Sequence, residues 1–405
     1  MKARIQQLLF PFGKGNVSQL TLVYFFSTLY FYVPIATLYL QEKGLNYTMI
    51  NSLWAIITGT MFLTEIPTGM IADRIGRKKA IILALVLQLS GEVIFLFAQQ
   101  YWLFAICGVV GGLGFAFSSG CIESLVYEDL KKTNSIDQMT RAMGVIQAAS
   151  QSASLIAFAL GGWLLSELSQ TRFIIAIALT AGCVAVGFLL TFTLKEDHQR
   201  ISNNTEQHEN SLRYLKYGWQ LIRTNRVFRL LIALAIFTVP FRDYLINLYQ
   251  PRFIDAGLPP AWLGLGLAIA SGVGILCARY AYLLEKILGS RTALLISTLL
   301  PGLLYFVFAF VTGGWGLVPL FCVLLGVQSL KSPLLSAHLN THIADESRAT
   351  VLSLISMGSG AYVMLMGFLI GQIADKSLTN AFLLMGAVIS ISALAFRLKK
   401  EPEQD

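Results

Sequence analysis

Three of the carboxylic acids that stand inside long apolar stretches of this chain are placed where each could bind and release a proton. They are Glu65, Glu123 and Asp243. An ionisable side chain is costly to place in hydrocarbon, so such residues usually lie on a pathway for protons, ions or polar molecules. We therefore take all three as proton-coupling candidates. The alternatives are structural: a hydrogen bond for Glu65, a buried pair with a cation for Glu123, and an interhelical salt bridge for Asp243.

Asp243 belongs to a wider set of polar residues around Pro240. Arg242 precedes it directly, and Asn247 follows one helical turn later. Proline removes a backbone hydrogen bond and can kink a helix at this point. An arginine can bind a carboxylate or a phosphate with two hydrogen bonds. Arg242 and Asn247 are therefore candidates for lining a substrate cavity.

Polar and aromatic side chains at helical spacing suggest further cavity residues. Glu123 shares a helix face with Ser119 and Tyr127, and a second stripe runs through Gln147, Gln151 and Ser154. Two such stripes predict a hydrated vestibule. Aromatic rings can hold amphipathic or cationic ligands. The full set of cavity candidates is Arg242, Asn247, Gln147, Gln151, Tyr24, Tyr32 and Tyr244.

The elements that position these residues must be membrane helices. The chain has 405 residues, of which 55% are hydrophobic and 13% are charged, and its mean hydropathy is +0.65. A soluble protein of this length needs roughly a quarter of its residues charged. The apolar residues fall in runs of about 20, which is long enough to cross the hydrocarbon core of a bilayer. Since backbone groups in lipid must be satisfied within the segment, these runs are helices. The sequence predicts an all-α membrane protein.

We count twelve apolar spans, in two sets of six. A polar stretch divides the chain into an N-terminal six-helix bundle over residues 1–194, a central cytoplasmic loop over 195–227 and a C-terminal six-helix bundle over 228–405. The spans are approximately 18–40, 48–71, 80–98, 102–127, 142–165, 172–194, 228–250, 261–284, 292–312, 316–336, 349–371 and 380–397.

Basic residues predict the orientation of the spans. With the N-terminus in the cytoplasm, most cations fall in cytoplasmic segments, and the outer segments hold only Lys43, Arg172, Arg252 and Lys376. Cytoplasmic loops carry the excess of lysine and arginine in membrane proteins. We expect a multi-pass protein of the cytoplasmic (inner) membrane with both termini cytoplasmic. The net charge of +8 is spread over these loops, which argues against a nucleic-acid partner.

The loop between the second and third spans has a specific pattern. Residues 69–79 read GMIADRIGRKK, and we call them the signature loop. Gly69 lies four residues before Asp73 on the same helix face, where a glycine lets another helix approach. Gly76 suits a tight turn. A weaker echo, with Glu285, Gly289 and Arg291, follows the eighth span.

This spacing resembles the loop between the second and third helices of the major facilitator superfamily (MFS). The resemblance implies two pseudo-symmetric six-helix bundles around a central cavity and rocker-switch alternating access. It also implies a conformational latch. Asp73 would meet the N-terminus of span 11 near Ser347 and Arg348, and Arg77 would pair with Glu128 or Asp129. The expected latch residues are Gly69, Asp73, Arg74, Gly76, Arg77, Lys78, Glu128 and Asp129.

Three other intramembrane or terminal residues receive structural interpretations. Lys331 lies near the cytoplasmic end of span 10, from which its ammonium can snorkel to water. Glu92 follows Gln88 by four residues, which favours an internal pair between them. Asp375 ends a second Gly-x-x-x-Asp sequence that begins at Gly371, but it lacks the glycine–arginine tail. We read it as an ordinary helix end.

Two functions of a transporter remain open at this stage. Buried carboxylates, aromatics and similarity of residues 64–69 to bacterial drug exporters favour proton-coupled antiport that exports amphipathic compounds. However, drug/proton antiporters of the superfamily carry Gly-Pro-x-x-Gly-Gly in span 5, and here only Gly161 and Gly162 remain. The alternative is a carrier for one polar metabolite, such as a sugar, organic acid or siderophore.

An enzyme is not supported by any motif in the chain. The sequence has neither the Gly-x-x-x-x-Gly-Lys-Ser/Thr phosphate loop nor His-Glu-x-x-His for zinc. The five cysteines are scattered singly, which is typical of buried free thiols. We expect no cofactor and no metal, a monomer, and protons and a small molecule as partners within the lipid bilayer.

Overall fold

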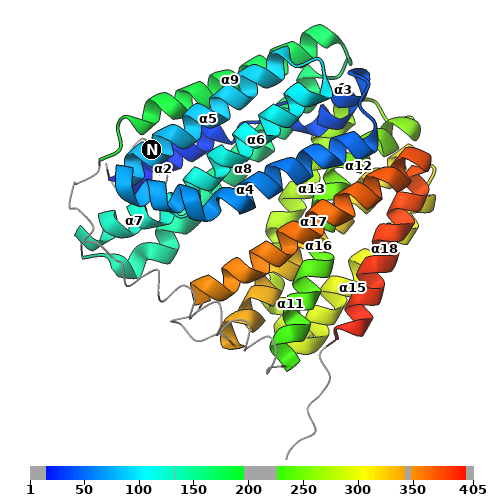
Figure 1. Ribbon diagram of the computed structural model, residues 1–405. Helices are drawn as coiled ribbons and strands as arrows, with labels where there is room; N and C mark the ends of the chain where they lie inside the picture. Colours follow the sequence, from blue (N-terminus) through cyan, green and yellow to red (C-terminus); the bar gives the residue numbers. More distant parts are fainter. Residues whose placement is uncertain (1–14, 133, 196–225, 343–347, 398–405) are drawn as a thin grey trace, which may run out of the picture. The chain divides into compact units, whose positions relative to one another are not determined.

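The computed structural model describes residues 15–132, 134–195, 226–342 and 348–397. These residues form helices and turns without a strand (Figure 1). In the first half the helices are α2 (Asn16–Ser27), η1 (Val33–Ile35), α3 (Ala36–Glu42), α4 (Tyr47–Ile75), α5 (Arg77–Phe97), α6 (Tyr101–Ser118), α7 (Cys121–Lys132), η2 (Ile136–Gln138), α8 (Met139–Leu164) and α9 (Gln170–Thr191). In the second half they are α11 (Arg226–Thr238), α12 (Phe241–Asp255), α13 (Ala261–Arg279), α14 (Ala281–Leu288), α15 (Ser290–Phe310), α16 (Gly314–His342), α17 (Arg348–Lys376) and α18 (Leu378–Ala395).

Helices cover each of the apolar spans that the sequence predicts. Within the described ranges, ten helical segments are long and apolar enough to cross a membrane. The all-α membrane fold is therefore confirmed, whereas the number of twelve spans stays a prediction. Nearly all of the polar central segment, at 196–225, and both predicted cytoplasmic termini lie outside the described residues.

Four of the predicted spans are interrupted. Span 1 is divided between α2 and α3, and span 8 changes helix at Tyr280. Span 4 breaks at Gly120, whose φ of 66° favours glycine. Span 7 breaks at Val239 and Pro240, because proline supplies no backbone donor. Irregular backbone at membrane depth is tolerated only where protein covers it or where it lines a cavity.

The helices form two compact units. Unit 1 contains residues 1–39 and 56–201, and unit 2 contains residues 40–55 and 202–405. In unit 1, α5 packs against α6 and α9, and α2 packs against α8 and α9. In unit 2, α13 packs against α16, and α18 packs against α15 and α17 (Figure 1). Helix α4 begins in unit 2 and continues in unit 1.

Each unit contains a glycine turn of the same conformation. Gly76 joins α4 to α5 with φ 99° and ψ 152°, and Gly289 joins α14 to α15 with φ 75° and ψ 155°. In both turns the glycine N–H binds the carbonyl four residues earlier, and its carbonyl accepts from the residue four later. The weak sequence echo thus corresponds to a repeated backbone turn, which only glycine adopts easily.

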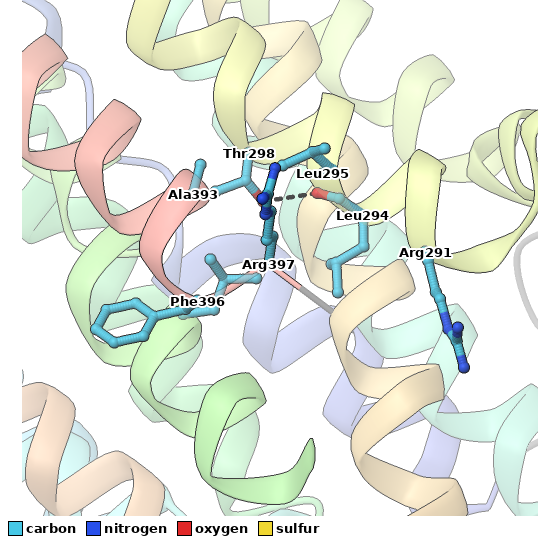
Figure 2. Close-up of a pocket in the computed structure, with 8 residues that line it drawn as sticks. Arg291, Leu294, Leu295, Thr298, Ala393, Phe396 and Arg397 are labelled. Carbon is cyan, nitrogen blue, oxygen red and sulfur yellow. Dashed lines mark hydrogen bonds between the residues drawn. The ribbon is translucent and has the colours of Figure 1, made fainter. Parts of the chain in front are cut away.

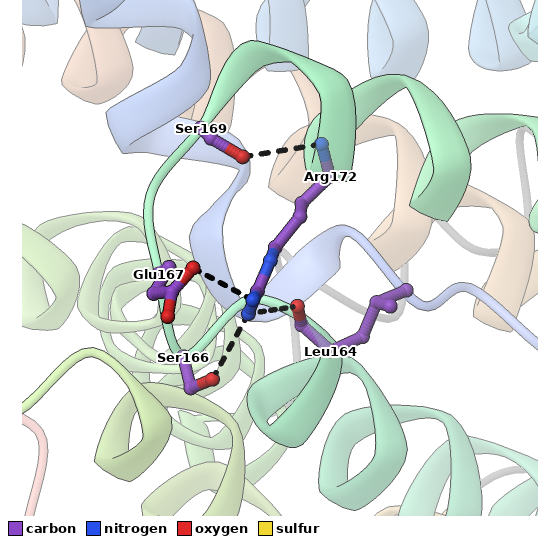
Figure 3. A network of polar contacts seen from close by, with 5 residues as sticks. All are labelled: Leu164, Ser166, Glu167, Ser169 and Arg172. Carbon is purple, nitrogen blue, oxygen red and sulfur yellow. Dashed lines mark hydrogen bonds and ion pairs between the residues drawn. The ribbon is translucent and has the colours of Figure 1, made fainter.

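Two arginines on the predicted outer side bind the ends of helices. Figure 3 shows Arg172 donating to the Leu164 carbonyl and the Ser166 hydroxyl, both at 3.2 Å, and pairing with Glu167 at 2.7 Å. In unit 2, Arg252 donates to the carbonyls of Ala309 and Val311 at 2.8 and 3.0 Å. Cations near a helix C-terminus satisfy its last carbonyls and complement its dipole. This explains two of the exceptions to the charge pattern.

Candidate functional site

The break of span 7 exposes backbone groups that side chains of unit 2 then satisfy. In a continuous helix the Thr238 carbonyl would accept from the N–H of Arg242, but that N–H points instead to Val239 at 3.5 Å. Lys331 of α16 takes its place, with Nζ donating to the Thr238 oxygen at 2.8 Å. Polar side chains thus re-satisfy the freed carbonyl, as buried backbone requires.

A second chain of hydrogen bonds reaches the other side of the break. The Tyr305 hydroxyl donates to the Phe241 carbonyl at 2.8 Å, and Gln328 Nε2 donates to the Tyr305 oxygen at 2.9 Å. Gln328 Oε1 is buried and has no partner among the residues that the structure describes. Side chains of α15 and α16 therefore hold the break in place, and Gln328 Oε1 is left as an unused acceptor within the described ranges.

Lys331 is the residue at this break that sequence reasoning missed. The snorkelling expectation is wrong, because Lys331 is only 4% exposed and its ammonium points to the break of span 7. Sequence position alone places Lys331 near a predicted helix end, but it does not show toward which neighbour the side chain extends. One sequence signal was available. Lys331 occurs in the same half of the chain as Pro240, and a proline break leaves a backbone carbonyl that needs a donor.

Arg242 and Asp243 lie in the first turn of α12, and both side chains are exposed. Asp243 is the third residue of α12, and Glu123 is likewise the third residue of α7. Each acid thus lies where a helix restarts after a break inside a membrane span. A helix N-terminus favours negative charge. Glu123 is also exposed, so both carboxylates are accessible from their own units.

Asn247 and Tyr244 lie deeper in unit 2 than the sequence suggests. Tyr244 is buried, and its hydroxyl donates to the Val363 carbonyl at 2.5 Å. Asn247 Oδ1 accepts from the Trp54 indole at 3.1 Å. Asn247 Nδ2 and both polar side-chain atoms of the buried Asn51 have no hydrogen-bond partner within the described part of the chain. Buried polar groups of this kind usually have partners.

In unit 1 the structure joins Tyr32 to Glu92. The Tyr32 hydroxyl, at the break of span 1, donates to Glu92 Oε1 at 3.1 Å. Glu92 is 7% exposed, and its Oε2 has no partner among the described residues. The expected internal pair between Gln88 and Glu92 is wrong, since the partner comes from another helix. Tyr32 is thus a positioning residue for a buried acid as well as a cavity candidate.

The remaining candidates of unit 1 lie apart from this pair. Gln147 and Gln151 are exposed on α8, as a hydrated stripe requires. Tyr24 is half-buried and packs against the hydrophobic core of its unit. Glu65 is half-buried on α4. Their roles in a cavity or in proton coupling stay predictions.

The signature loop contributes local contacts inside unit 1. Arg77 forms an ion pair with Asp73 at 2.5 Å, one helical turn apart. Lys78 Nζ donates to the Phe192 carbonyl at 2.9 Å. A Cβ on Gly69 would meet nothing within 4 Å inside its unit. Gly69 therefore leaves open space on α4, and Arg74, also in this loop, is exposed.

The predicted partners of the latch are only partly described. Asp129 Oδ2 accepts from the backbone N–H of Asn16 at 2.9 Å, so this acid caps the start of α2. Glu128 is half-buried beside it on α7. Ser347, the expected cap of span 11, lies outside the described residues. Pairing of Arg77 with Glu128 or Asp129 stays a prediction.

Asp375 is a further residue that the sequence interpretation missed. Its carboxylate accepts from the backbone N–H groups of Tyr47 and Thr48 at 2.6 and 3.2 Å, and from the Thr48 hydroxyl at 2.5 Å. The reading of Asp375 as an ordinary helix end is wrong, because it caps the N-terminus of α4. The sequence signal was the repeated Gly-x-x-x-Asp pattern, which is shared with Gly69 and Asp73.

A small pocket lies elsewhere in unit 2, between α11, α15 and α18. Figure 2 shows Leu294, Thr298, Phe396 and Arg397 around it, with the Thr298 hydroxyl bound to the Leu294 carbonyl at 2.8 Å. Its two cations, Arg291 and Arg397, fall in segments that are predicted to be cytoplasmic. Basic residues are expected at this membrane surface, so we assign the pocket no role in transport.

The broken membrane helices, the buried ionisable groups and the glycine turn are features that a membrane transporter can use. The chain belongs to the Major Facilitator Superfamily, whose family model matches residues 20–359. The fold class expected from the signature loop is thereby confirmed.

Curated relatives of low sequence identity include two drug-resistance proteins and an MFS-type transporter. Multidrug resistance protein 2 of Bacillus subtilis (strain 168) is 22% identical over 92% of both chains. Quinolone resistance protein NorA of Staphylococcus aureus (strain MSSA476) is 21% identical over 74% of both. The chain is also similar to the Bacillus subtilis MFS-type transporter YxaM, at 21% identity over 90% of both.

Solved structures of other transporters share the fold. The nucleoside transporter NupG superposes with a TM-score of 0.74 at 14% identity, covering 94% of this chain and 98% of NupG. A D-xylose–proton symporter superposes with a TM-score of 0.71 at 15% identity, covering 94% of this chain and 95% of the symporter. At such identities the likeness extends to the fold alone.

Proposed function

We propose that this protein exports amphipathic compounds across the cytoplasmic membrane by rocker-switch alternating access, and that protons drive the export. The observation that carries the proposal is the pair Arg242 and Asp243, which are exposed on the first turn of α12 at a break inside a membrane span. Similarity to multidrug and quinolone resistance proteins supports the class of cargo.

Proton coupling in this proposal is carried by the acids at the helix starts. Asp243 and Glu123 are accessible at helix starts and can exchange protons with water in the cavity. Protonation of either removes a negative charge that the helix N-terminus favours. A cationic substrate and a proton then compete for the same carboxylate, which makes export of one depend on entry of the other. Glu65 remains a third candidate for this exchange.

The signature loop supports the conformational part of the proposal. Within unit 1, the Asp73–Arg77 pair and the bond from Lys78 to Phe192 hold the start of α5. Gly69 offers open space for another helix to approach α4. The protein works as a monomer in this proposal.

A carrier for one polar metabolite is the second candidate function. The observation in its favour is the set of unsatisfied buried amide atoms on Asn51, Asn247 and Gln328. A site built to hydrogen-bond a substrate rejects analogues that leave its polar groups unpaired. These amides could bind the hydroxyl or amide groups of a sugar or related molecule, for which Arg242 could supply a charge contact.

A ligand screen by thermal shift tests which of the two functions holds. The purified protein in detergent is mixed with lipophilic cations, sugars, organic acids and siderophores at two pH values. A ligand that binds only the folded state stabilises it by about 2.7 kcal/mol at 100 times its dissociation constant. We expect stabilisation by several unrelated lipophilic cations, which changes with pH and disappears in Asp243→Asn.

Stabilisation by one hydrophilic compound, and its loss in Arg242→Ala, would instead establish the metabolite carrier. Lys286→Ala is a matched control, because Lys286 is an exposed cation on α14 away from the break. This variant should retain every ligand-induced shift of the parent protein.

A further inference from the structure

The start of α4 is capped by a residue that lies more than three hundred positions away in the sequence. Asp375, next to last in α17, binds the N–H groups of Tyr47 and Thr48 through different oxygens, and its Oδ2 also accepts from the Thr48 hydroxyl. Asp375 thus uses both carboxylate oxygens on one helix N-terminus. Such caps satisfy backbone donors that a helix leaves free.

A glycine one turn earlier lets the two helices touch at this point. A Cβ on Gly371 would lie 2.6 Å from Thr48 Cα, 3.0 Å from Thr48 N and 3.0 Å from the Tyr47 carbonyl oxygen. All three atoms belong to the backbone, so no side-chain rotation could relieve the clash. Gly371 and Asp375 together form one contact, which we call the α17–α4 clasp.

The clasp joins unit 2 to a helix that continues into unit 1. Residues 40–55 belong to unit 2, whereas the rest of α4 belongs to unit 1. The first turns of α4 therefore stay with unit 2 for as long as the clasp holds. In the clasped arrangement the Asn51 side-chain amide is buried without a hydrogen-bond partner among the described residues, which costs free energy. Release of the clasp would return its nitrogen and oxygen to water.

We propose that the clasp of Asp375 and Gly371 holds the first turns of α4 on α17 inside unit 2 and keeps Asn51 from water, and that exposure of Asn51 to the predicted outer side during the transport cycle requires release of the clasp. The inference rests on the alternating access proposed above, but it does not depend on the cargo or on proton coupling. Asp375 is in this view the counterpart of Asp73. Each acid follows a glycine by four residues, and each lies in the last turn of its helix, α17 for Asp375 and α4 for Asp73.

A cysteine at position 51 can report the opening of the clasp. Asn51 is 1% exposed, and its side chain makes no hydrogen bond that the substitution would remove. The five native cysteines are first replaced by serine or alanine. Asn51→Cys is then labelled in proteoliposomes with a membrane-impermeant maleimide added from the predicted outer side. Met49→Cys, at a site that is 39% exposed, reports the maximal rate.

Asp375→Ala and Gly371→Ala should each accelerate labelling at position 51. Loss of an N-cap changes an equilibrium by roughly 2- to 30-fold, which corresponds to 0.5–2 kcal/mol, and we expect an increase of that size for Asp375→Ala. Asp375→Asn retains one acceptor oxygen and should give an intermediate rate. Labelling of Met49→Cys should stay unchanged in all variants.

Asp255→Ala is the matched control. Asp255 is an exposed acid at the end of α12 that interacts with Tyr47 only through charge, without a hydrogen bond to α4 among the described residues. An equal effect of Asp255→Ala would reduce Asp375 to one surface charge among others and overturn the proposal. Unchanged labelling in both Asp375→Ala and Gly371→Ala would overturn it as well.

The result is independent of the proposed cargo. If the ligand screen fails but labelling responds to the clasp variants, the clasp stands and only the substrate class is wrong. If lipophilic cations bind as expected and labelling does not respond, the clasp proposal is wrong and the proposed function stands. Size-exclusion chromatography of each variant identifies any that fail to fold, and Asp375→Asn serves as the milder substitute for those.

Discussion

The ammonium group of Lys331 donates a hydrogen bond of 2.8 Å to the backbone carbonyl of Thr238, at the point where span 7 breaks. The carbonyl lacks its usual helical partner because the chain turns at Pro240. A lysine that is 4% exposed thereby does the work of a backbone N–H. The position of Arg242 and Asp243 depends on this hydrogen bond, since both residues follow the break directly.

Replacing Lys331 by methionine should destabilise the protein. Met fills a similar volume but leaves the Thr238 carbonyl without a donor, and an unsatisfied buried group costs about 1–3 kcal/mol. Thermal unfolding in detergent measures the loss. Lys286→Met, on the exposed face of α14, should change stability by less than about 0.5 kcal/mol. Equal stabilities of the two variants would show that the Lys331 bond does not support the break.

Alanine at Gly76 should be strained, because the turn has φ 99° and ψ 152°. A residue with a side chain costs about 1–3 kcal/mol in such backbone regions. The same loss is expected for Gly289→Ala, at φ 75°. Gly182 offers the contrast: it lies inside α9, and an added Cβ would meet nothing within 4 Å.

Gly182→Ala should therefore stabilise the helix by roughly 0.5–1 kcal/mol. Unfolding temperatures of the three variants, measured under one condition, test the comparison. A Gly76→Ala protein as stable as Gly182→Ala would contradict the assigned turn.

The sequence was sufficient for features that depend on local pattern. Gly76 is recognisable because a tight turn between two apolar spans needs its conformational freedom. The spans themselves follow from length and hydropathy. Lys331, Glu92 and Asp375 could not be interpreted from neighbouring residues, because each binds a partner on another helix: Thr238, Tyr32 and the start of α4. Position in the sequence does not reveal such pairs, which depend on how the helices are rotated.

The breaks in the spans show the same limit. Pro240 marks one of them in the sequence, and Gly120 marks another. Pro34 lies in η1 between α2 and α3, but the run of aromatic residues before it, which includes Tyr32, does not show where α2 ends. Tertiary packing decides such cases, and it placed a cavity candidate beside a buried acid that the sequence had paired with Gln88.

Tyr32 and Glu92 should be energetically coupled. Tyr32→Phe removes the donor to Glu92 Oε1, whose other oxygen has no partner among the described residues. Loss of a hydrogen bond to a buried acid costs about 1.5–3 kcal/mol. Glu92→Gln should lower the cost of Tyr32→Phe, so the double variant should be more stable than the sum of single effects predicts.

A double-mutant cycle from thermal unfolding measures this coupling. An interaction free energy of 0.5 kcal/mol or more is expected for residues in contact. Strict additivity would mean that the Tyr32 hydroxyl contributes nothing to holding Glu92.

Neutral variants of the two acids at helix starts should separate their roles. Asp243 and Glu123 are both the third residue of a helix that follows a break. If Asp243 exchanges the coupled proton and binds the cationic substrate, Asp243→Asn abolishes both the acceleration of export by a pH gradient and the stabilisation by lipophilic cations. Glu167→Gln, which alters an exposed acid on the turn between α8 and α9, is the control and should behave as the parent.

The most direct test of the account is transport by the purified protein in proteoliposomes. A fluorescent lipophilic cation is followed with and without an imposed pH gradient, in the parent and in a variant that carries Glu65→Gln, Glu123→Gln and Asp243→Asn. We predict that the gradient drives movement of the cation in the parent and has no effect in the triple variant. Flux that responds equally to the gradient in both proteins would contradict proton coupling through these acids.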